Sequence, residues 1–159
     1  METGGDRTYV AALKLLAGRE LSEAQLRLRL ERRRFDAAEV DAAVAKLRHE
    51  RALDDRRVAL ACARKEASVR TRGRTRILRQ LETIGIERNT ARAAVNEVFA
   101  EIDEAALLER ALERRLTRGV TLDDPAGLRR VYRYLVGQGF DSSRVAALMR
   151  RRSKVDVIE

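Results

Sequence analysis

An apolar pattern that recurs three times limits the fold of this chain more than any other feature of its sequence. In each copy, one large apolar residue is followed nine positions later by another, in the pairs Leu26 and Phe35, Ile77 and Ile86, and Val131 and Phe140. Two further apolar positions keep the same spacing, at Val40, Ala91 and Val145, and at Val44, Val95 and Met149. Repeats of about 50 residues with one apolar skeleton are typical of stacked supersecondary units. The sequence therefore predicts three related units in tandem.

The composition places these units in the all-α class. The chain has 159 residues, of which 45% are hydrophobic, 37% charged and 4% aromatic, with one proline. Leu, Ala, Arg and Glu dominate and favour long helices, whereas a β-sandwich or barrel would need β-branched and aromatic runs between Gly or Pro turns. We expect three helices in each unit. They should begin at or just after Val10, Ser22 and Asp36, then Asp55, Arg74 and Arg88, then Glu104, Asp124 and Asp141.

Polar residues at two of these starts form capping patterns. Ser22 can accept a hydrogen bond from the Gln25 N–H while the Gln25 side chain reaches back, which is a capping box. Asp36, with Glu39 three residues further on, shows the same pattern. Both therefore favour a helix that begins at the next residue.

A very short turn joins the second and third helices of each unit. Gly85 and Gly139 precede its apolar residue, at a position where a left-handed residue ends a helix. The first unit has Arg34 there, which should cost about 1 kcal/mol relative to glycine. Such a connection has helix-turn-helix geometry, so the expected fold is an elongated, curved array of three tandem three-helix, helix-turn-helix-like repeats. The expected segments are a flexible N-terminus at 1–8, repeats at 9–52, 53–102 and 103–153, and a C-terminal tail at 154–159.

The net charge of +9 implies a partner or surface of negative charge. Nucleic acid, an acidic protein groove and an anionic membrane all qualify. The chain begins Met1-Glu2-Thr3-Gly4-Gly5-Asp6, without the basic and apolar regions of a signal peptide. No apolar run approaches the ~20 residues of a membrane span, and the single cysteine, Cys62, excludes an intramolecular disulfide. These features predict a cytoplasmic protein that has no membrane anchor.

The densest positive charge lies in residues 64–79, where Glu66 is the single acidic residue. The cations of this main cluster are Arg64, Lys65, Arg70, Arg72, Arg74, Arg76 and Arg79. Arginine pairs bidentately with phosphate or carboxylate, so the main cluster is a candidate for binding DNA or an acidic protein groove. The alternative is a solvated face of an Arg-rich protein.

Two further groups of cations are weaker candidates for a partner-binding site. A second cluster on one predicted helix is also a candidate partner-binding site, although Glu23, Glu31 and Glu39 nearby allow ordinary surface ion pairs. Its members are Arg27, Arg29, Arg32 and Arg33. The basic C-terminal end is expected to be a frayed, solubilising tail. It consists of Arg150, Arg151, Arg152 and Lys154.

Patterns typical of enzyme sites are absent from the sequence. His49 has no Ser or Cys partner at a recognisable position, and Cys62 lies in an apolar helical stretch where a small buried thiol is the ordinary interpretation. The pairs Asp54-Asp55 and Asp123-Asp124 stand at helix starts, where capping explains them. We therefore expect no catalysis, no metal site and no cofactor.

Four segments occur in an order that is typical of one protein family. They are Ser22-Glu23-Ala24-Gln25-Leu26, Leu53-Asp54-Asp55, the run from Arg70 to Leu81, and Gly85-Ile86. This combination resembles the RecX family of bacterial recombination regulators, over roughly residues 10–150. The chain departs from the family at Val58, where an aromatic is common, and at Arg72-Gly73-Arg74-Thr75, where a Tyr-Gly-Pro-like stretch is usual.

The resemblance implies three tandem three-helix repeats and a non-enzymatic regulator of the RecA recombinase. Family members lodge in the groove of the RecA–DNA filament and mostly inhibit strand exchange, ATP hydrolysis and co-protease activity. The expected partners are thus the RecA filament and DNA, the latter bound weakly and in a salt-sensitive way or through RecA, and we expect a monomer. The residues themselves leave two alternatives, a direct DNA-binding protein that uses helix-turn-helix-like units and a helical scaffold for another acidic protein.

Overall fold

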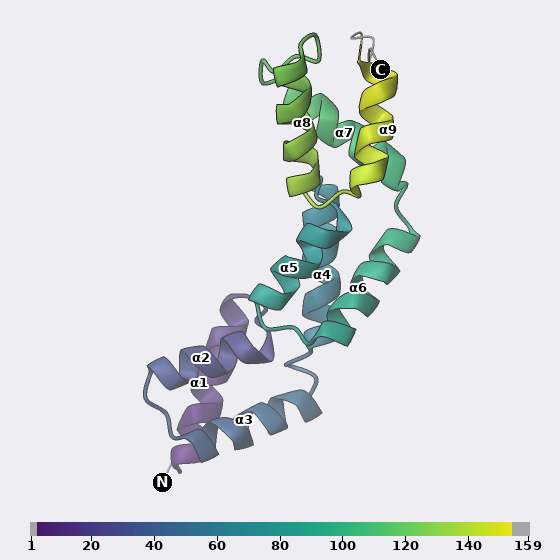
Figure 1. Ribbon diagram of the computed structural model, residues 1–159. Helices are drawn as coiled ribbons and strands as arrows, with labels where there is room; N and C mark the ends of the chain where they lie inside the picture. Colours follow the sequence, from purple (N-terminus) through teal and green to yellow (C-terminus); the bar gives the residue numbers. More distant parts are fainter. Residues whose placement is uncertain (1–2, 154–159) are drawn as a thin grey trace. The chain divides into compact units, whose positions relative to one another are not determined.

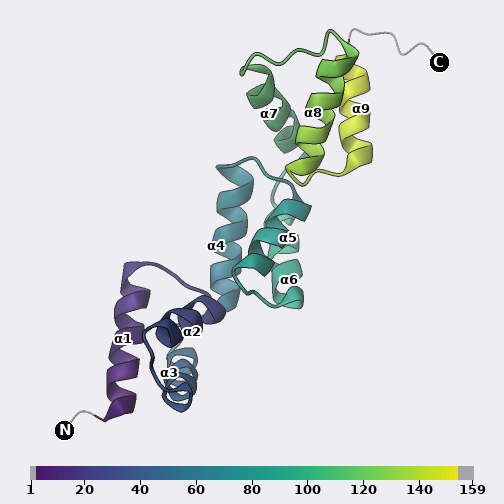
Figure 2. The ribbon, with the colours of Figure 1, turned by 60° about the vertical axis from the view of Figure 1, so that its left-hand side comes forward.

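In the computed structural model, which describes residues 3–153, every regular element is an α-helix (Figures 1 and 2). The helices are α1 (Gly4–Gly18), α2 (Glu23–Arg32), α3 (Ala37–His49), α4 (Asp55–Ser68), α5 (Arg74–Thr83), α6 (Arg88–Ala100), α7 (Glu104–Leu116), α8 (Pro125–Gly137) and α9 (Ser142–Arg152). They follow one another in the predicted order of three helices per repeat. The predicted all-α class with helical repeats is confirmed.

The chain folds into two compact units. The first contains α1 to α3, the beginning of α4 as far as Ala61, and Leu81–Ala94, which covers the end of α5 and the start of α6. The second contains Cys62–Gln80 and the chain from Val95 onward, including α7 to α9. The helices of the second repeat, α4 to α6, therefore each contribute residues to both units.

The apolar skeleton of the first repeat forms a core between its three helices. The helix α1 packs against both α2 and α3 (Figure 2). Leu26 and Leu30 lie one turn apart on α2 and are fully buried together with Val44 and Leu47 of α3. Burial of such a side chain stabilises a fold by about 1.5–3 kcal/mol. The repeated apolar spacing thus marks the residues that hold the helices together.

The first helix begins earlier than the sequence analysis predicts. The stretch 1–8, expected to be a flexible terminus, is helical from Gly4 onward. Thr3 accepts a hydrogen bond from the Asp6 N–H at 3.3 Å, and the Asp6 carboxylate accepts one from the Thr3 N–H at 3.2 Å. This capping box satisfies the first N–H groups of α1. The predicted helix start at Val10 is too late because it relied on apolar spacing, and residues 4–8 carry no large apolar side chain.

The start of α3 also differs from its prediction. Asp36 caps α3 by accepting a hydrogen bond from the Ala38 N–H at 3.0 Å, but Glu39 does not complete a capping box. The Glu39 carboxylate instead accepts a hydrogen bond at 3.0 Å from the hydroxyl of Thr8, a buried residue of α1. Glu39 therefore serves the tertiary contact between α1 and α3 and not the cap that the local sequence pattern predicts.

The third repeat forms its own core in the second unit. The helix α8 packs against α7 and α9 (Figure 1). Leu112, Val131 and Leu135 are fully buried there. Asp124 caps α8 through its side chain, as predicted, and Asp141 caps α9 in the same way.

The turn between the second and third helices has the same backbone conformation in every repeat. Arg34, Gly85 and Gly139 have φ angles of 62°, 83° and 97°, which confirms the predicted left-handed residues. In each copy the N–H of the following residue donates a hydrogen bond to the carbonyl oxygen five residues before it, at 3.3, 3.0 and 3.4 Å. This hydrogen bond closes the C-terminus of the second helix and lets the third begin almost at once.

In the second unit, the carbonyl groups of the turn after α8 also accept hydrogen bonds from N–H groups at the start of α5. Gly73 precedes α5 and offers no side chain as a cap. Its N–H donates instead to the carbonyl oxygen of Gln138 at 2.8 Å, and the Thr75 N–H donates to that of Gly139 at 3.2 Å. A Cβ atom on Gly73 would lie 2.5 Å from the carbonyl carbon and oxygen of Gly139. Glycine is therefore required where these two backbone segments meet.

A related contact closes the start of α2 in the first unit. The Ser22 hydroxyl accepts a hydrogen bond from the Gln25 N–H at 3.1 Å, which completes the predicted capping box, and it donates to the carbonyl oxygen of Ile84. A Cβ atom on Gly85 would lie 2.3 Å from the Cβ of Ala24. In both units, the end of one second helix thus meets the start of the second helix of the preceding repeat.

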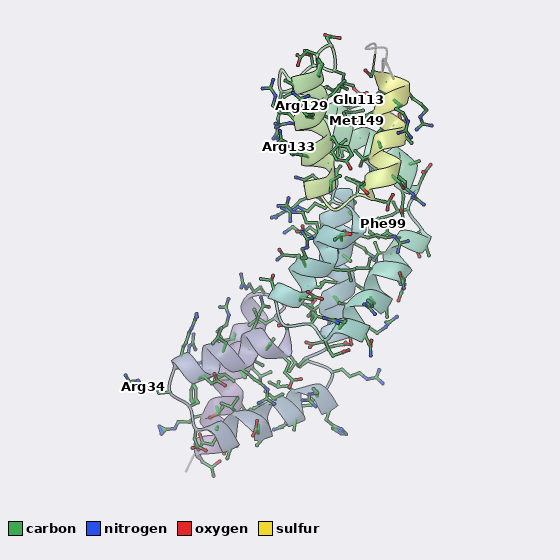
Figure 3. All side chains as sticks on the ribbon, viewed as in Figure 1. Arg34, Phe99, Glu113, Arg129, Arg133 and Met149 are labelled. Carbon is green, nitrogen blue, oxygen red and sulfur yellow. The ribbon has the colours of Figure 1, made fainter. Side chains whose placement is uncertain are left out.

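Replacing Arg34 by glycine should stabilise the first unit, because glycine adopts a positive φ without a Cβ clash. The Arg34 side chain points away from the helices (Figure 3), so little contact is lost. We expect Arg34→Gly to raise the free energy of unfolding by about 1 kcal/mol. Urea unfolding followed by circular dichroism would show a higher midpoint at an unchanged slope. Arg33→Gly is the control, because Arg33 has a φ of −85° and should gain nothing; equal gains would contradict the strain argument.

Substitution of Gly73 should destabilise the second unit, because a Cβ atom would overlap the turn after α8. We expect Gly73→Ala to lower the free energy of unfolding by about 1–3 kcal/mol. Gly137→Ala is the matched control, since a Cβ there meets nothing within 4 Å and alanine favours the helix. Scanning calorimetry of both variants measures the difference. A Gly73→Ala variant as stable as Gly137→Ala would show that the close backbone contact is not needed.

Candidate functional site

The main cluster lies entirely in the second unit, in three consecutive parts of the chain. Arg64 and Lys65 belong to α4, Arg70 and Arg72 to the segment between α4 and α5, and Arg74, Arg76 and Arg79 to α5. Their contacts divide them into cations that serve the fold and cations that a partner could reach.

Glu66 is a buried carboxylate in the middle of this cluster. The residue is only 5% exposed and forms ion pairs with Arg72 and, at 3.6 Å, with Arg70. The Arg72 side chain is itself 15% exposed, and its backbone N–H donates to the carbonyl oxygen of Glu66 at 3.0 Å. A buried charge is tolerated only when it has such partners. Arg72 therefore neutralises Glu66, and its guanidinium is not free to bind a partner.

Arg74 is also engaged within the chain. Its guanidinium forms an ion pair with Glu104 at 2.5 Å, donates to the side-chain oxygen of Asn96 at 3.0 Å and lies 4.8 Å from the ring centroid of Phe99. Arg144 of α9 reaches the second oxygen of Glu104 at 2.8 Å. These contacts connect the start of α5 with the end of α6 and the start of α7.

The remaining cations of α4 and α5 are accessible. Arg64, Lys65 and Arg79 are exposed, and Arg76 is half-buried with one long hydrogen bond of 3.4 Å to the carbonyl oxygen of Gly137. Arg76 and Arg79 are three residues apart on α5 and so share a face of that helix. We call Arg64, Lys65, Arg76 and Arg79 the outward cations. They are the part of the main cluster best placed to meet an anionic partner.

One cation of the second cluster, Arg27, is also paired with carboxylates of the chain itself. Arg27 of α2 forms ion pairs with Glu23 at 3.1 Å and with Asp41 at 2.5 Å, and Arg48 of α3 reaches Glu23 at 2.7 Å. Burial acts to raise the pKa of the Glu23 carboxyl, but the hydrogen bonds from Arg48 and Arg27 outweigh it and hold that pKa below its ordinary value. Arg27 thus links α2 with α3 instead of presenting its charge outward.

The other cations of the second cluster remain on the surface. Arg32 and Arg33 are exposed and Arg29 is half-buried. The basic C-terminal end differs from its prediction, because α9 continues as far as Arg152, and Arg152 forms an ion pair with Glu113. Cations in the last turn suit the helix dipole and support this extension. Lys154 lies outside the described residues.

Three exposed arginines of α8 lie outside both predicted clusters. They are Arg129, Arg130 and Arg133. Charge density along the sequence does not reveal them, because Val131 and Tyr132 interrupt the run. The spacing of Arg129 and Arg133 is the signal that could have found them, since residues four apart lie on one face of a helix.

The residues considered for catalysis have ordinary surroundings. His49 is exposed in the last turn of α3. Cys62 is half-buried, and burial raises the pKa of its thiol, which disfavours the reactive thiolate. Within residues 3–153, no group of three His, Cys, Asp or Glu side chains is arranged to hold a metal ion. Asp54 caps α4 by accepting a hydrogen bond from the Arg57 N–H at 3.1 Å.

These observations define a class of protein. The described chain is a tandem helical-repeat protein in which some arginines neutralise carboxylates within the fold and others lie exposed on helix faces. In that same part of the chain, no helix combines the length and apolar character needed to cross a membrane.

Comparison with known proteins identifies the family within this class. The family model described as "RecX, first three-helix domain" matches residues 9–47. Regulatory protein RecX of Syntrophotalea carbinolica is 35% identical over 137 residues, which cover 85% of this chain and 89% of that protein. Regulatory protein RecX of Trichlorobacter lovleyi is 33% identical over 147 residues, 90% of this chain and 94% of that protein. The chain belongs to the RecX family of regulatory proteins.

Solved structures show the same fold. The crystal structure of RecX from Lactobacillus salivarius has a TM-score of 0.77 at 16% identity and covers 93% of this chain and 96% of that one. A second crystal structure, of a regulatory protein RecX, has a TM-score of 0.79 at 21% identity and covers 93% of this chain and 72% of that one. The helical-repeat architecture is therefore shared at low sequence identity.

Loss of the Arg72 side chain should destabilise the second unit. Glu66 would stay buried, and only Arg70, at 3.6 Å, would balance its charge. We expect Arg72→Ala to lower the free energy of unfolding by about 3 kcal/mol. Arg64→Ala, an exposed control in the same cluster, should change it by less than about 0.5 kcal/mol. Urea unfolding measures both effects. Adding Glu66→Gln to Arg72→Ala should recover part of the loss, and equal effects of the two single variants would contradict an internal role for Arg72.

Proposed function

We propose that this chain is a non-enzymatic regulator that binds the RecA–DNA filament and inhibits strand exchange, ATP hydrolysis and co-protease activity. Membership of the RecX family supports this proposal, and the related proteins are named regulatory proteins. The observation that carries the contact itself is the set of outward cations on α4 and α5. We also propose that the protein acts as a monomer in the cytoplasm, where its proposed partner works.

The outward cations would pair with anions along the groove of the filament. Arginine can bind a carboxylate of RecA or a phosphate of the enclosed DNA through two parallel hydrogen bonds, whereas Lys65 would act as a point charge. A single exposed pair contributes little, so several contacts along the chain are needed. Arg29, Arg32 and Arg33 of α2 would provide a secondary set in the first unit.

Contacts at successive RecA subunits would explain inhibition without catalysis. We propose that the repeats comprise residues 9–52, 53–102 and 103–153, and that different repeats contact different subunits. Occupation of the groove would exclude the incoming duplex. Bridging of neighbouring subunits would hold them in an arrangement that disfavours ATP turnover.

The decisive experiment measures the single-stranded-DNA-dependent ATP hydrolysis of RecA, with the protein titrated below one copy per RecA. A variant with Arg76→Glu and Arg79→Glu should need about tenfold more protein for half-inhibition, because both reversed charges would face anions. Arg88→Glu with Arg92→Glu on α6 is the matched control, since both residues are exposed and the charge change is the same. Equal loss in the two variants would remove α5 from the mechanism.

A second arm separates the RecA filament from DNA as the partner. Excess single-stranded DNA is added to the same assay, and direct DNA affinity is measured at several salt concentrations. Inhibition that survives excess DNA supports binding through RecA. Inhibition that disappears, together with a steep loss of DNA affinity at high salt, would favour a direct DNA-binding protein with helix-turn-helix-like units.

A further inference from the structure

A groove of about 430 Å³ lies between α8 and α9 in the second unit. Its floor consists of Leu128, Tyr132, Ala146 and Met149, and Ser153 lies at one end. Its rim consists of Arg129, Arg133 and Arg150. Figure 3 shows Arg129 and Arg133 on α8 and Met149 on α9. The groove therefore combines an apolar floor with a cationic rim.

The shared register of the repeats allows the same surface to be compared in the first repeat. The positions of Leu128, Tyr132, Ala146 and Ser153 correspond there to Glu23, Arg27, Asp41 and Arg48. Those four side chains are joined by ion pairs at 3.1, 2.5 and 2.7 Å, in the order Arg27 to Glu23, Arg27 to Asp41 and Arg48 to Glu23. The first repeat thus covers this surface with its own charged side chains.

In the second repeat, Arg74 covers part of the corresponding surface. Arg74 occupies the position of Leu128, while Asn96 and Phe99 occupy those of Arg150 and Ser153. The Arg74 guanidinium spans the surface, with 3.0 Å to the Asn96 side chain and 4.8 Å to the Phe99 ring centroid. Leu128 can form neither of these contacts, because its side chain is apolar. The floor of the third groove therefore stays uncovered by the residues that line it.

The earlier repeats also indicate what this surface accepts. In each, the segment after the third helix supplies a carboxylate, since Asp55 accepts the Glu23 N–H at 2.8 Å and Glu104 binds Arg74 at 2.5 Å. Both carboxylates end a short apolar and acidic run, Leu53-Asp54-Asp55 or Ile102-Asp103-Glu104. In both earlier repeats, a carboxylate from the next helix is thus bound at this surface.

We propose that the groove between α8 and α9 docks an acidic, apolar segment of a partner protein. One large apolar side chain would enter the floor, and flanking Asp or Glu residues would pair with Arg129, Arg133 and Arg150. Arg129 and Arg133 are one helical turn apart and match carboxylates with the same spacing on a partner helix. Met149 adapts its shape to different apolar side chains. The groove lies on other helices than the outward cations, so this docking site does not depend on the proposed function.

A nucleic acid is less well matched to this groove. Surfaces that bind single strands stack bases on several aromatic side chains. Among the described residues, Tyr132 is the one aromatic residue that lines this groove, and the other floor residues are aliphatic or Met. The floor therefore favours the side chains of a peptide.

The test measures binding of a fluorescein-labelled synthetic peptide to the full chain by fluorescence anisotropy. The peptide carries two leucines four residues apart, flanked by glutamates, and a scrambled peptide of the same composition lacks the apolar face. We expect the scrambled peptide to bind about tenfold more weakly, because it cannot fill the floor while pairing with the rim.

Matched variants assign the binding to the groove. Arg133→Glu should weaken the peptide about fivefold to tenfold, whereas Arg130→Glu, an exposed reversal on the same helix outside the groove, should change it less than about twofold. Ala146→Asp places in the floor the residue type that the first repeat has at Asp41, and it should abolish binding. Circular dichroism and thermal unfolding confirm that each variant is folded.

Several outcomes would overturn the proposal. Equal effects of Arg133→Glu and Arg130→Glu would indicate diffuse charge attraction and no docking site. A single-stranded oligonucleotide that displaces the peptide and depends on Arg133 in the same way would make the groove a nucleic-acid surface. Peptide binding that appears only after the chain is shortened at Ser153 would assign the groove to the chain's own end. A concentration-dependent dimer that excludes the peptide would assign it to a second copy.

Discussion

The left-handed residue between the second and third helices is the constraint on which the rest of the structure depends. It turns the backbone so that one hydrogen bond ends the second helix and the third helix can start. In two repeats the same residue is a glycine that also admits a neighbouring segment, Gly85 beside Ala24 and Gly139 beside Gly73. A single backbone conformation therefore both shapes the repeat and provides its contact with the preceding one. The apolar skeleton can recur with constant spacing because this turn is constant.

Charge imposes a second constraint, because an Arg-rich chain uses its cations in two ways. Arg72 neutralises the buried Glu66. Arg74, at the start of α5, contacts Glu104, Asn96 and Phe99. The pair of Arg72 and Glu66 is costly to break, since the remaining partner would keep a buried charge. Cations on exposed helix faces can exchange water for a partner's anions. Charge density in the sequence measures the sum of both kinds and does not distinguish them.

The features that could be predicted from the sequence depend on residues close together along the chain. The apolar register, the cap at Ser22 and the left-handed Arg34 each follow from a few neighbouring residues, and the structure confirms them. The internal role of Arg74 could not be predicted, because its partner Glu104 is 30 residues away and meets it only in the folded chain. The groove of the third repeat could not be predicted either. It exists because the third repeat lacks the charged side chains that cover this surface in the other two repeats.

The three copies of this surface show how one scaffold separates folding from recognition. The residues that hold the helices together, such as Leu26, Ile77 and Val131, are apolar and buried in every repeat. The position three residues before each of these carries Glu23, Arg74 or Leu128 at the start of the second helix, and each choice alters what the surface can bind. The first two choices are satisfied within the chain by ion pairs and hydrogen bonds. The third replaces a charge with an apolar side chain below a rim of arginines, and such a surface is completed by a segment that brings both an apolar residue and a carboxylate.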